Sequence, residues 1–236
     1  MMPNQTPRTN LLLPTIILFF AAVRVNAQYK TDYQAWQKLE VEAKVARAYG
    51  ISVNIETRFT DNCSDYTYHF IDFGNYIRIF DKLKLSFDIL YVDKKVNKAD
   101  EIHSIRWQYN LSATYRNRFG RFLFYDRVLN EAQYVDYKPA KNGEVMQDRY
   151  LRDKATLRYK LTKRFYPYIE DEIYYRFDRQ KHNPPGFNRN RFYAGCLFYV
   201  DKLDRFDLFY MREHNFNVTP LTNNNIFGIG FSRSLF

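Results

Sequence analysis

The chain has 236 residues, of which 26% are charged and 19% aromatic, and its formal net charge is +10. Beyond an apolar run near the N-terminus, no stretch is long and apolar enough for a membrane helix, which excludes a helical membrane protein. The basic residues are spread along the whole chain and form no single patch, so we expect no nucleic-acid partner.

The first residues have the three parts of a secretory signal. Arg8 supplies a positive charge, residues 11–23 form an apolar run, and residues 25–27 (VNA) make a small-residue cleavage site. The run has about 13 residues, whereas a membrane-spanning helix needs roughly 20, and Pro14 interrupts it. We therefore predict a cleaved signal peptide at 1–27, in preference to an uncleaved membrane anchor.

The segment GISVNIETRF, residues 50–59, alternates apolar and polar side chains, which places one set on each face of a β-strand. The apolar face of such a strand points to the core in a soluble protein and to lipid in a membrane barrel. The same alternation predicts eleven strands, at residues 35–46, 51–60, 68–80, 83–94, 103–117, 122–131, 150–161, 165–178, 191–200, 206–214 and 225–236. Most span about 9 to 15 residues, which matches tilted membrane strands and exceeds the average soluble strand of about 5 to 6.

The connections between these strands alternate in length. Short turns lie at residues 46–50, 81–82, 118–121, 162–164 and 201–205, and longer polar connections lie at 61–67, 95–102, 132–149, 179–190 and 215–224. Short turns at one rim and long loops at the other are typical of outer-membrane barrels. We therefore predict an all-β fold, with one exported domain at 28–236 that forms an antiparallel, transmembrane, up-and-down β-barrel.

The number of strands leaves alternatives open, because bacterial barrels of one chain contain an even number. Either residues 28–34 add a twelfth strand, or segment 35–46 lies inside a ten-stranded barrel, or one strand is wrongly split or merged. We predict ten to twelve strands and prefer twelve.

Three segments resemble a known family. Trp36 is followed by the strand–turn–strand unit KVARAYGISVNIETRF, residues 150–161 read YLRDKATLRYKL, and the chain ends with RFDLFYMRE and NNIFGIGFSRSLF. Together they resemble the outer-membrane barrels of Gram-negative bacteria grouped as domain of unknown function 2490. The resemblance covers nearly all of the mature chain and implies the barrel fold and the outer membrane, but the family has no established activity to carry over.

The last strand ends on Phe236. A terminal aromatic residue resembles the assembly signal of outer-membrane barrels, although Phe231 and Leu235 share the apolar phase and Phe236 falls in the other. We expect the barrel-assembly machinery to recognise this strand. We also expect contact with outer-membrane lipid and lipopolysaccharide, and a monomer.

If the apolar faces meet lipid, the polar faces line the lumen. The candidate lumen-lining residues are Glu56, Arg58, Asp88, Arg106, Arg116, Arg127, Arg152, Lys154, Arg158, Glu170, Glu172 and Arg176. Their basic bias would favour anionic solutes in an open pore. In the alternative interpretation, arginines and carboxylates pair across a narrow barrel and fill it.

No catalytic, metal-binding or cofactor-binding residue is predicted. His103 and Ser104 are adjacent, which puts them on opposite faces of a strand, and no nucleophile–base constellation is visible elsewhere. Glu170 and Glu172 lie on one face, and a glycosidase could use such a pair of carboxylates. Any strand with alternating charged residues in a lumen has the same spacing, so the pair does not indicate an enzyme. Two cysteines form neither a disulfide framework nor a metal-ligand spacing.

These observations predict a non-enzymatic outer-membrane β-barrel protein, either structural or a narrow passive channel with a charged, basic-biased lumen. Two alternatives stay open. One is a lipid- or envelope-modifying barrel enzyme, and the other is a soluble periplasmic β-protein that binds a ligand and turns its apolar faces inward.

Overall fold

The computed structural model describes residues 30–97, 102–135, 147–178 and 184–235. The predicted signal peptide and Phe236 lie outside these residues. Eleven β-strands are present in the described chain: β1 (Lys30–Ala43), β2 (Tyr49–Thr60), β3 (Asp65–Ile79), β4 (Leu83–Asn97), β5 (Ile102–Phe119), β6 (Phe122–Val135), β7 (Gln147–Tyr159), β8 (Phe165–Arg176), β9 (Gly186–Tyr199), β10 (Asp204–Asn215) and β11 (Thr222–Leu235). Within the described ranges, no helix is long and apolar enough to cross a membrane.

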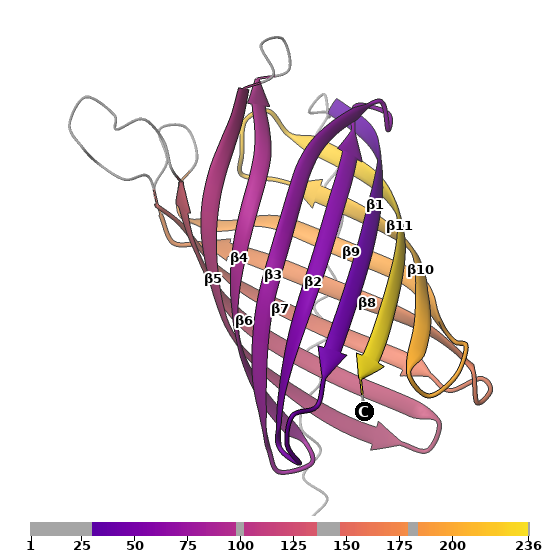
Figure 1. The fold of residues 1–236 in the computed structure, drawn as a ribbon. Helices are drawn as coiled ribbons and strands as arrows, with labels where there is room; N and C mark the ends of the chain where they lie inside the picture. Colours follow the sequence, from indigo (N-terminus) through magenta and orange to yellow (C-terminus); the bar gives the residue numbers. More distant parts are fainter. Residues whose placement is uncertain (1–29, 98–101, 136–146, 179–183, 236) are drawn as a thin grey trace, which may run out of the picture.

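The strands close into a single barrel in which each one pairs with its neighbours in the sequence (Figure 1). All these consecutive pairs are antiparallel. The pair that closes the ring, β1·β11, is parallel and runs from Lys30↔Thr222 to Ala43↔Leu235. The predicted all-β, up-and-down barrel is therefore confirmed.

The strand count of eleven lies within the predicted range of ten to twelve and differs from the preferred twelve. Residues 30–34, part of the segment 28–34 that one alternative made a twelfth strand, are the first part of β1, and residues 35–43 belong to the barrel wall. Successive antiparallel strands alternate in direction, so the first and last of eleven strands point the same way. They can close only as a parallel pair, whereas the preference for twelve assumed antiparallel closure.

The two ends of the barrel carry different connections. The turn end carries the short connections 44–48, 80–82, 120–121, 160–164 and 200–203, and we call the opposite end the loop end. The turn end lies at the bottom of Figure 1 and the loop end at the top. Connection 61–64, at the loop end, is shorter than the predicted 61–67 because β3 begins at Asp65.

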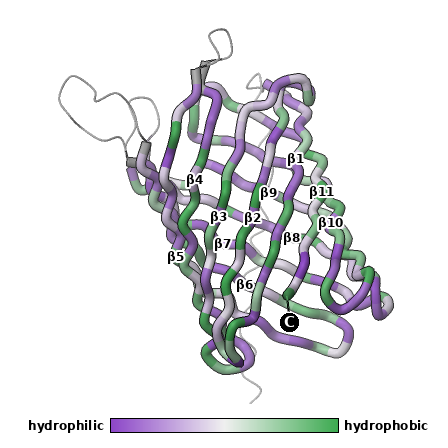
Figure 2. The backbone as a smooth tube through the Cα atoms, in the orientation of Figure 1, coloured by the Kyte–Doolittle hydropathy of each residue, from purple (hydrophilic) through white to green (hydrophobic). Residues whose placement is uncertain are grey.

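Most apolar side chains face outward, and the alternating colours along the strands in Figure 2 follow this pattern. Ile51 and Val53 are 44% and 39% exposed, whereas Glu56 and Arg58 of the same strand line the interior. Exposed leucine, isoleucine and phenylalanine side chains recur on strands all around the barrel. A soluble protein rarely exposes so large an apolar surface, so this exterior suits lipid.

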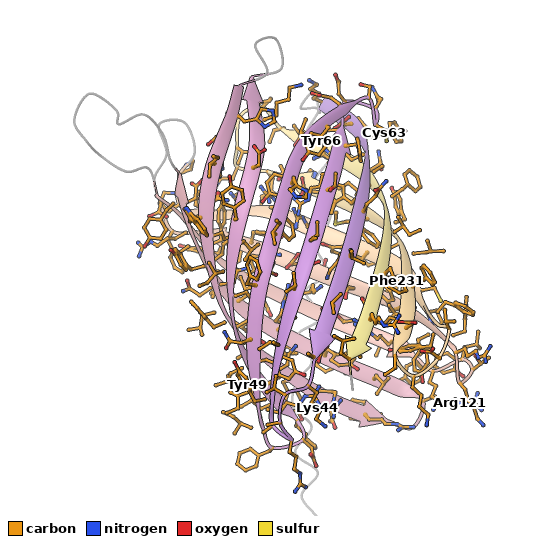
Figure 3. The ribbon with its side chains drawn as sticks, viewed as in Figure 1. Lys44, Tyr49, Cys63, Tyr66, Arg121 and Phe231 are labelled. Carbon is orange, nitrogen blue, oxygen red and sulfur yellow. The ribbon has the colours of Figure 1, made fainter. Side chains whose placement is uncertain are left out.

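Aromatic side chains gather on the outer surface near the turn end. Phe119, Phe122 and Phe165 are exposed there, and the Phe122 ring packs 5.0 Å from that of Tyr159. Figure 3 places Tyr49 at the turn end and Tyr66 near the loop end. These positions fit the aromatic girdles that mark the two interfaces of membrane barrels.

Candidate functional site

The interior of the barrel holds a polar cavity of about 810 Å³. Its lining comes from β1 through β10, and β11 adds none of it. On β11 the buried positions are Ile226, Gly228 and Gly230, and a Phe209 ring from β10 covers Gly228. The cavity is therefore bounded by side chains from ten strands, and on the eleventh the Phe209 ring packs against Gly228.

Ten of the twelve predicted lumen residues line this cavity: Glu56, Arg58, Asp88, Arg106, Arg127, Arg152, Lys154, Glu170, Glu172 and Arg176. Arg116 and Arg158 do not. Arg116 is exposed at the turn end and donates a hydrogen bond to the carbonyl of Asp81 at 3.0 Å. The Arg158 guanidinium lies 4.6 Å from the Tyr125 ring centroid, on the turn side of the cavity.

Glu172 is the centre of the ion pairs inside the barrel. Its side chain is 1% exposed and lies 2.8 Å from Arg152, 3.2 Å from Arg127 and 3.7 Å from Arg191. The Tyr174 hydroxyl donates a hydrogen bond to the same carboxylate at 3.0 Å. The alternation of β8 points Glu170, Glu172 and Tyr174 inward together, so the carboxylate meets cations from the strands on both sides.

The ion pairs continue around the wall on either side of Glu172. Arg152 also binds Glu131 on β6 at 2.8 Å, and Arg191 binds Glu213 on β10 at 2.7 Å. The resulting series, which we call the ladder, is Glu131, Arg152, Glu172, Arg191 and Glu213, one residue from each strand of β6 through β10. Buried ion pairs with this many hydrogen bonds offset their desolvation cost and fix the positions of their side chains.

Two apolar clusters occupy the interior beside the ladder. One contains Trp36, Tyr168, Tyr193, Leu197, Met211 and Ile226, and the other contains Phe70, Leu90 and Val92. Arg58 joins them, because its guanidinium lies 3.7 Å from the Trp36 ring centroid and 5.8 Å from that of Phe70. Arg191 approaches the same Trp36 ring to 5.2 Å. Cation–π contacts thus tie the apolar side of the lumen to its charged side.

The charges along the cavity are nearly balanced, with eleven basic and ten acidic side chains, so the predicted basic bias amounts to one charge. They are unevenly distributed along the barrel axis. Toward the loop end the lining contains Arg58, Lys94, Arg106, Arg176 and Arg189, with Asp148 and Glu213. Toward the turn end it contains Glu40, Asp72, Asp88 and Asp207, with Lys38 and Lys84. The remaining charges lie between and balance one another.

Sequence reasoning missed several cavity residues, among them Trp36, Lys38, Lys94, Glu131, Arg189, Arg191 and Glu213. A signal for most of them was present. Arg191 and Tyr193 alternate with Phe192 and Ala194, and the same period-two test would have placed them inside. Arg189 gives a weaker signal, because β9 contains an extra residue at Asn188 where the register with β8 shifts.

Potential reactive groups are distributed over both faces of the wall. His103 is exposed on the outside, where its Nδ1 lies 2.7 Å from Asp93, whereas Ser104 is buried inside. Cys63 and Cys196 are both unpaired thiols. In the described ranges, no group of three or more His, Cys, Asp or Glu side chains could hold a metal ion.

The barrel has the fold of outer-membrane proteins. The chain resembles the structure described as the NanC porin, with a TM-score of 0.50 and 10% identity over 77% of this chain and 86% of that one. It also matches the β domain of the Bordetella autotransporter Brka, with a TM-score of 0.43 and 11% identity over 77% and 81% of the two chains. At 10% identity the porin match establishes the fold alone. Among curated proteins, no sequence matches this chain.

The fold is therefore that of the outer-membrane type of β-barrel, and the sequence identifies the family. The family model described as "Protein of unknown function (DUF2490)" matches residues 33–225. That match covers most of the chain, so the protein belongs to the DUF2490 family. The segments around Trp36, at 150–161 and at 205–213 lie within it, whereas most of the closing segment 224–236 lies beyond its end.

Proposed function

We propose that this protein is a narrow passive channel of the outer membrane with no chemistry of its own. The observation that carries the proposal is the extent of the cavity along the barrel. Its lining runs from Thr60 and Lys94 near the loop end to Tyr76 and Lys84 near the turn end. A charged path inside an apolar wall is the arrangement that conducts small polar solutes across a membrane.

The size of the cavity limits what the channel would carry. About 810 Å³ lies within the range of small-molecule sites, roughly 300 to 1,000 Å³. The ladder and Trp36 occupy part of the cross-section. Ions and small metabolites fit this space, whereas polymers with bulky side groups do not.

The ladder also favours a second candidate function, a structural barrel filled by its own side chains. Each member of the ladder has an ion-pair partner, and Glu131 and Glu213 are 8% and 6% exposed. Small barrels are commonly filled in this way. The two candidates differ in one measurable property, which is whether the folded protein conducts ions.

The proposed absence of enzymatic activity is supported by the pairing of Glu170 and Glu172 with lumen cations. Lys154 lies 3.1 Å from Glu170, Thr156 donates to Glu170 at 2.8 Å, and Glu172 is shared by three arginines. A general acid or base must exchange a proton with its substrate. Carboxylates held by cations on several sides are poorly placed for that role.

The location and assembly form part of the same proposal. The apolar exterior and the aromatic residues at the turn end support insertion in the outer membrane, with the loop end on the outer side. We infer contact with lipid and lipopolysaccharide, assembly through the last strand with its terminal Phe236, and a monomeric barrel.

The test is single-channel recording with the purified, folded protein in a planar bilayer. Folding is checked first on a detergent gel, where a folded barrel migrates differently before and after boiling. We expect discrete conductance steps, and Trp36→Ala should enlarge them because the indole lines the cavity. Trp107→Ala is the matched control, since Trp107 is 46% exposed on the outer face. A barrel that shifts on the gel yet conducts nothing would contradict the channel and support the structural role.

A further inference from the structure

Five basic side chains converge in the loop half of the cavity: Arg58 on β2, Lys94 on β4, Arg106 on β5, Arg176 on β8 and Arg189 on β9. They reach the lumen from strands on opposite sides of the barrel. All five side chains line the same cavity, so their positive charges repel one another within it. Mutual repulsion of this kind is unfavourable unless an anion shares the site.

The five side chains differ in how they are neutralised. Arg58 forms an ion pair with Glu56 at 2.5 Å, and Arg189 lies 3.8 Å from Glu213. Among the described residues, no carboxylate lies within ion-pair distance of Lys94, Arg106 or Arg176. The loop half of the lumen therefore holds positive charge that the described residues do not pair.

Neutral groups hold the two unpaired guanidinium groups in place. Arg106 donates to the side-chain carbonyl of Gln133 at 3.1 Å, and Arg176 donates twice to the Tyr150 hydroxyl, at 2.9 and 2.6 Å. These bonds orient each guanidinium without cancelling its charge. The ladder arginines, in contrast, each bind a glutamate.

Part of each guanidinium is left without a partner. Arg176 is 6% exposed, yet its Nη1 has no hydrogen-bond partner among the described residues, and the same is true of the Arg106 Nε. A buried charged donor that lacks an acceptor is costly. Both side chains line the cavity, so an acceptor inside the lumen would relieve this cost.

We propose that the loop half of the lumen is a binding site for a small organic or inorganic oxyanion, carrying carboxylate or phosphate, held by Arg106, Arg176 and Lys94. The planar forks of the two arginines suit such oxygens, which accept paired N–H bonds. This inference rests on the proposed channel function and names the class of solute that enters it. The acidic turn half, with Asp72, Asp88 and Asp207, then disfavours retention of the anion farther along.

The test is calorimetric titration of citrate, and separately of inorganic phosphate, into the folded full-length barrel in detergent at low ionic strength. Glucose serves as an uncharged control. Arg106→Gln and Arg176→Gln should each weaken binding by about tenfold or more, as expected for loss of a charge-assisted hydrogen bond. Arg212→Gln removes the same charge from an exposed position on β10 and should leave the affinity unchanged. Weakening in all three variants alike would overturn the site, and so would no binding to the unaltered barrel.

The anion site remains testable even if one variant does not fold. If Arg176→Gln fails the gel test for folding, Arg106→Gln carries the comparison, because Arg106 is only partly buried. The experiments can also contradict the proposed channel and the proposed anion site separately. A folded barrel that binds citrate but passes no current contradicts the channel alone, whereas one that conducts and binds no anion contradicts the site alone.

Discussion

Glu172 illustrates how a single side chain organises the interior. It is 1% exposed and binds arginines from three strands, so its removal leaves Arg127, Arg152 and Arg191 without their shared carboxylate. Arg152 and Arg191 keep partners in Glu131 and Glu213, but the positive charges of all three then repel one another across the gap.

We expect Glu172→Gln to lower the free energy of unfolding by about 3 to 5 kcal/mol, the usual cost of breaking a buried pair from one side. Urea titration of the barrel in lipid vesicles measures this change. Asp178→Asn is the control, because its partner Arg149 is 52% exposed and a surface pair contributes about 1 kcal/mol or less. Equal losses in the two variants would show that the ladder does not stabilise the fold.

Among the strands, β11 carries two buried glycines, Gly228 and Gly230, two residues apart. A Cβ atom added at Gly228 would overlap the Phe209 ring, whereas one added at Gly230 would lie 3.4 Å from the Asp207 Cβ, an ordinary contact. The close approach of Phe209 therefore requires glycine at one of these positions and tolerates alanine at the other.

Gly228→Ala should destabilise the barrel by about 1 to 3 kcal/mol, since overpacking forces the ring of Phe209 out of place. Gly230→Ala, two residues along the same strand, should change the free energy of unfolding by much less. The same urea titration compares them. A similar loss in both would point to the strand's own preferences and not to the Phe209 contact.

At the scale of a turn, Asp201 closes the connection between β9 and β10. Its carboxylate accepts hydrogen bonds from the backbone N–H groups of Asp204 and Leu203, both at 2.7 Å. These bonds hold the pKa of the Asp201 carboxyl below its usual value. A lowered pKa means that the bonds stabilise the turn above the usual pKa and are lost as the pH falls through the lowered one.

We expect the amide NMR signals of Leu203 and Asp204 to shift with an acid midpoint below the ordinary aspartate value of about 3.9. Asp201→Asn should abolish this titration while the amides of the 160–164 turn behave as before. A midpoint at or above the ordinary value would mean that the turn gains nothing from the charged carboxylate.

For the whole molecule, the alternation of apolar and polar residues predicts the strands of the barrel wall better than it predicts the contacts inside the barrel. Alternation is a property of neighbouring residues, and it located the ends of all eleven strands to within five residues. It also chose the face of each lumen candidate. Alternation does not give the position of a residue along the barrel axis. Arg116 and Arg158 therefore share the inward phase yet lie outside the cavity lining.

The parts that escaped prediction depend on contacts between distant residues. Arg189 follows an extra residue in β9, and such a bulge interrupts the period-two pattern. The partners of Glu172 come from β6, β7 and β9, which the barrel brings together only after it closes. The direction of closure itself joins Lys30 to Thr222, and nothing in either segment alone specifies a parallel pair.

The parallel pairing of β1 with β11 places the two ends of the described chain at opposite rims. Lys30 lies at the loop end beside Thr222, and Leu235 lies at the turn end beside Ala43. Barrels with an even number of strands bring both ends to one rim, where a short peptide can join them. Here a circular permutant would need a linker as long as a strand, roughly 40 Å or more for 14 residues at about 3.3 Å each. Labels fused to the two ends would accordingly report from different sides of the membrane.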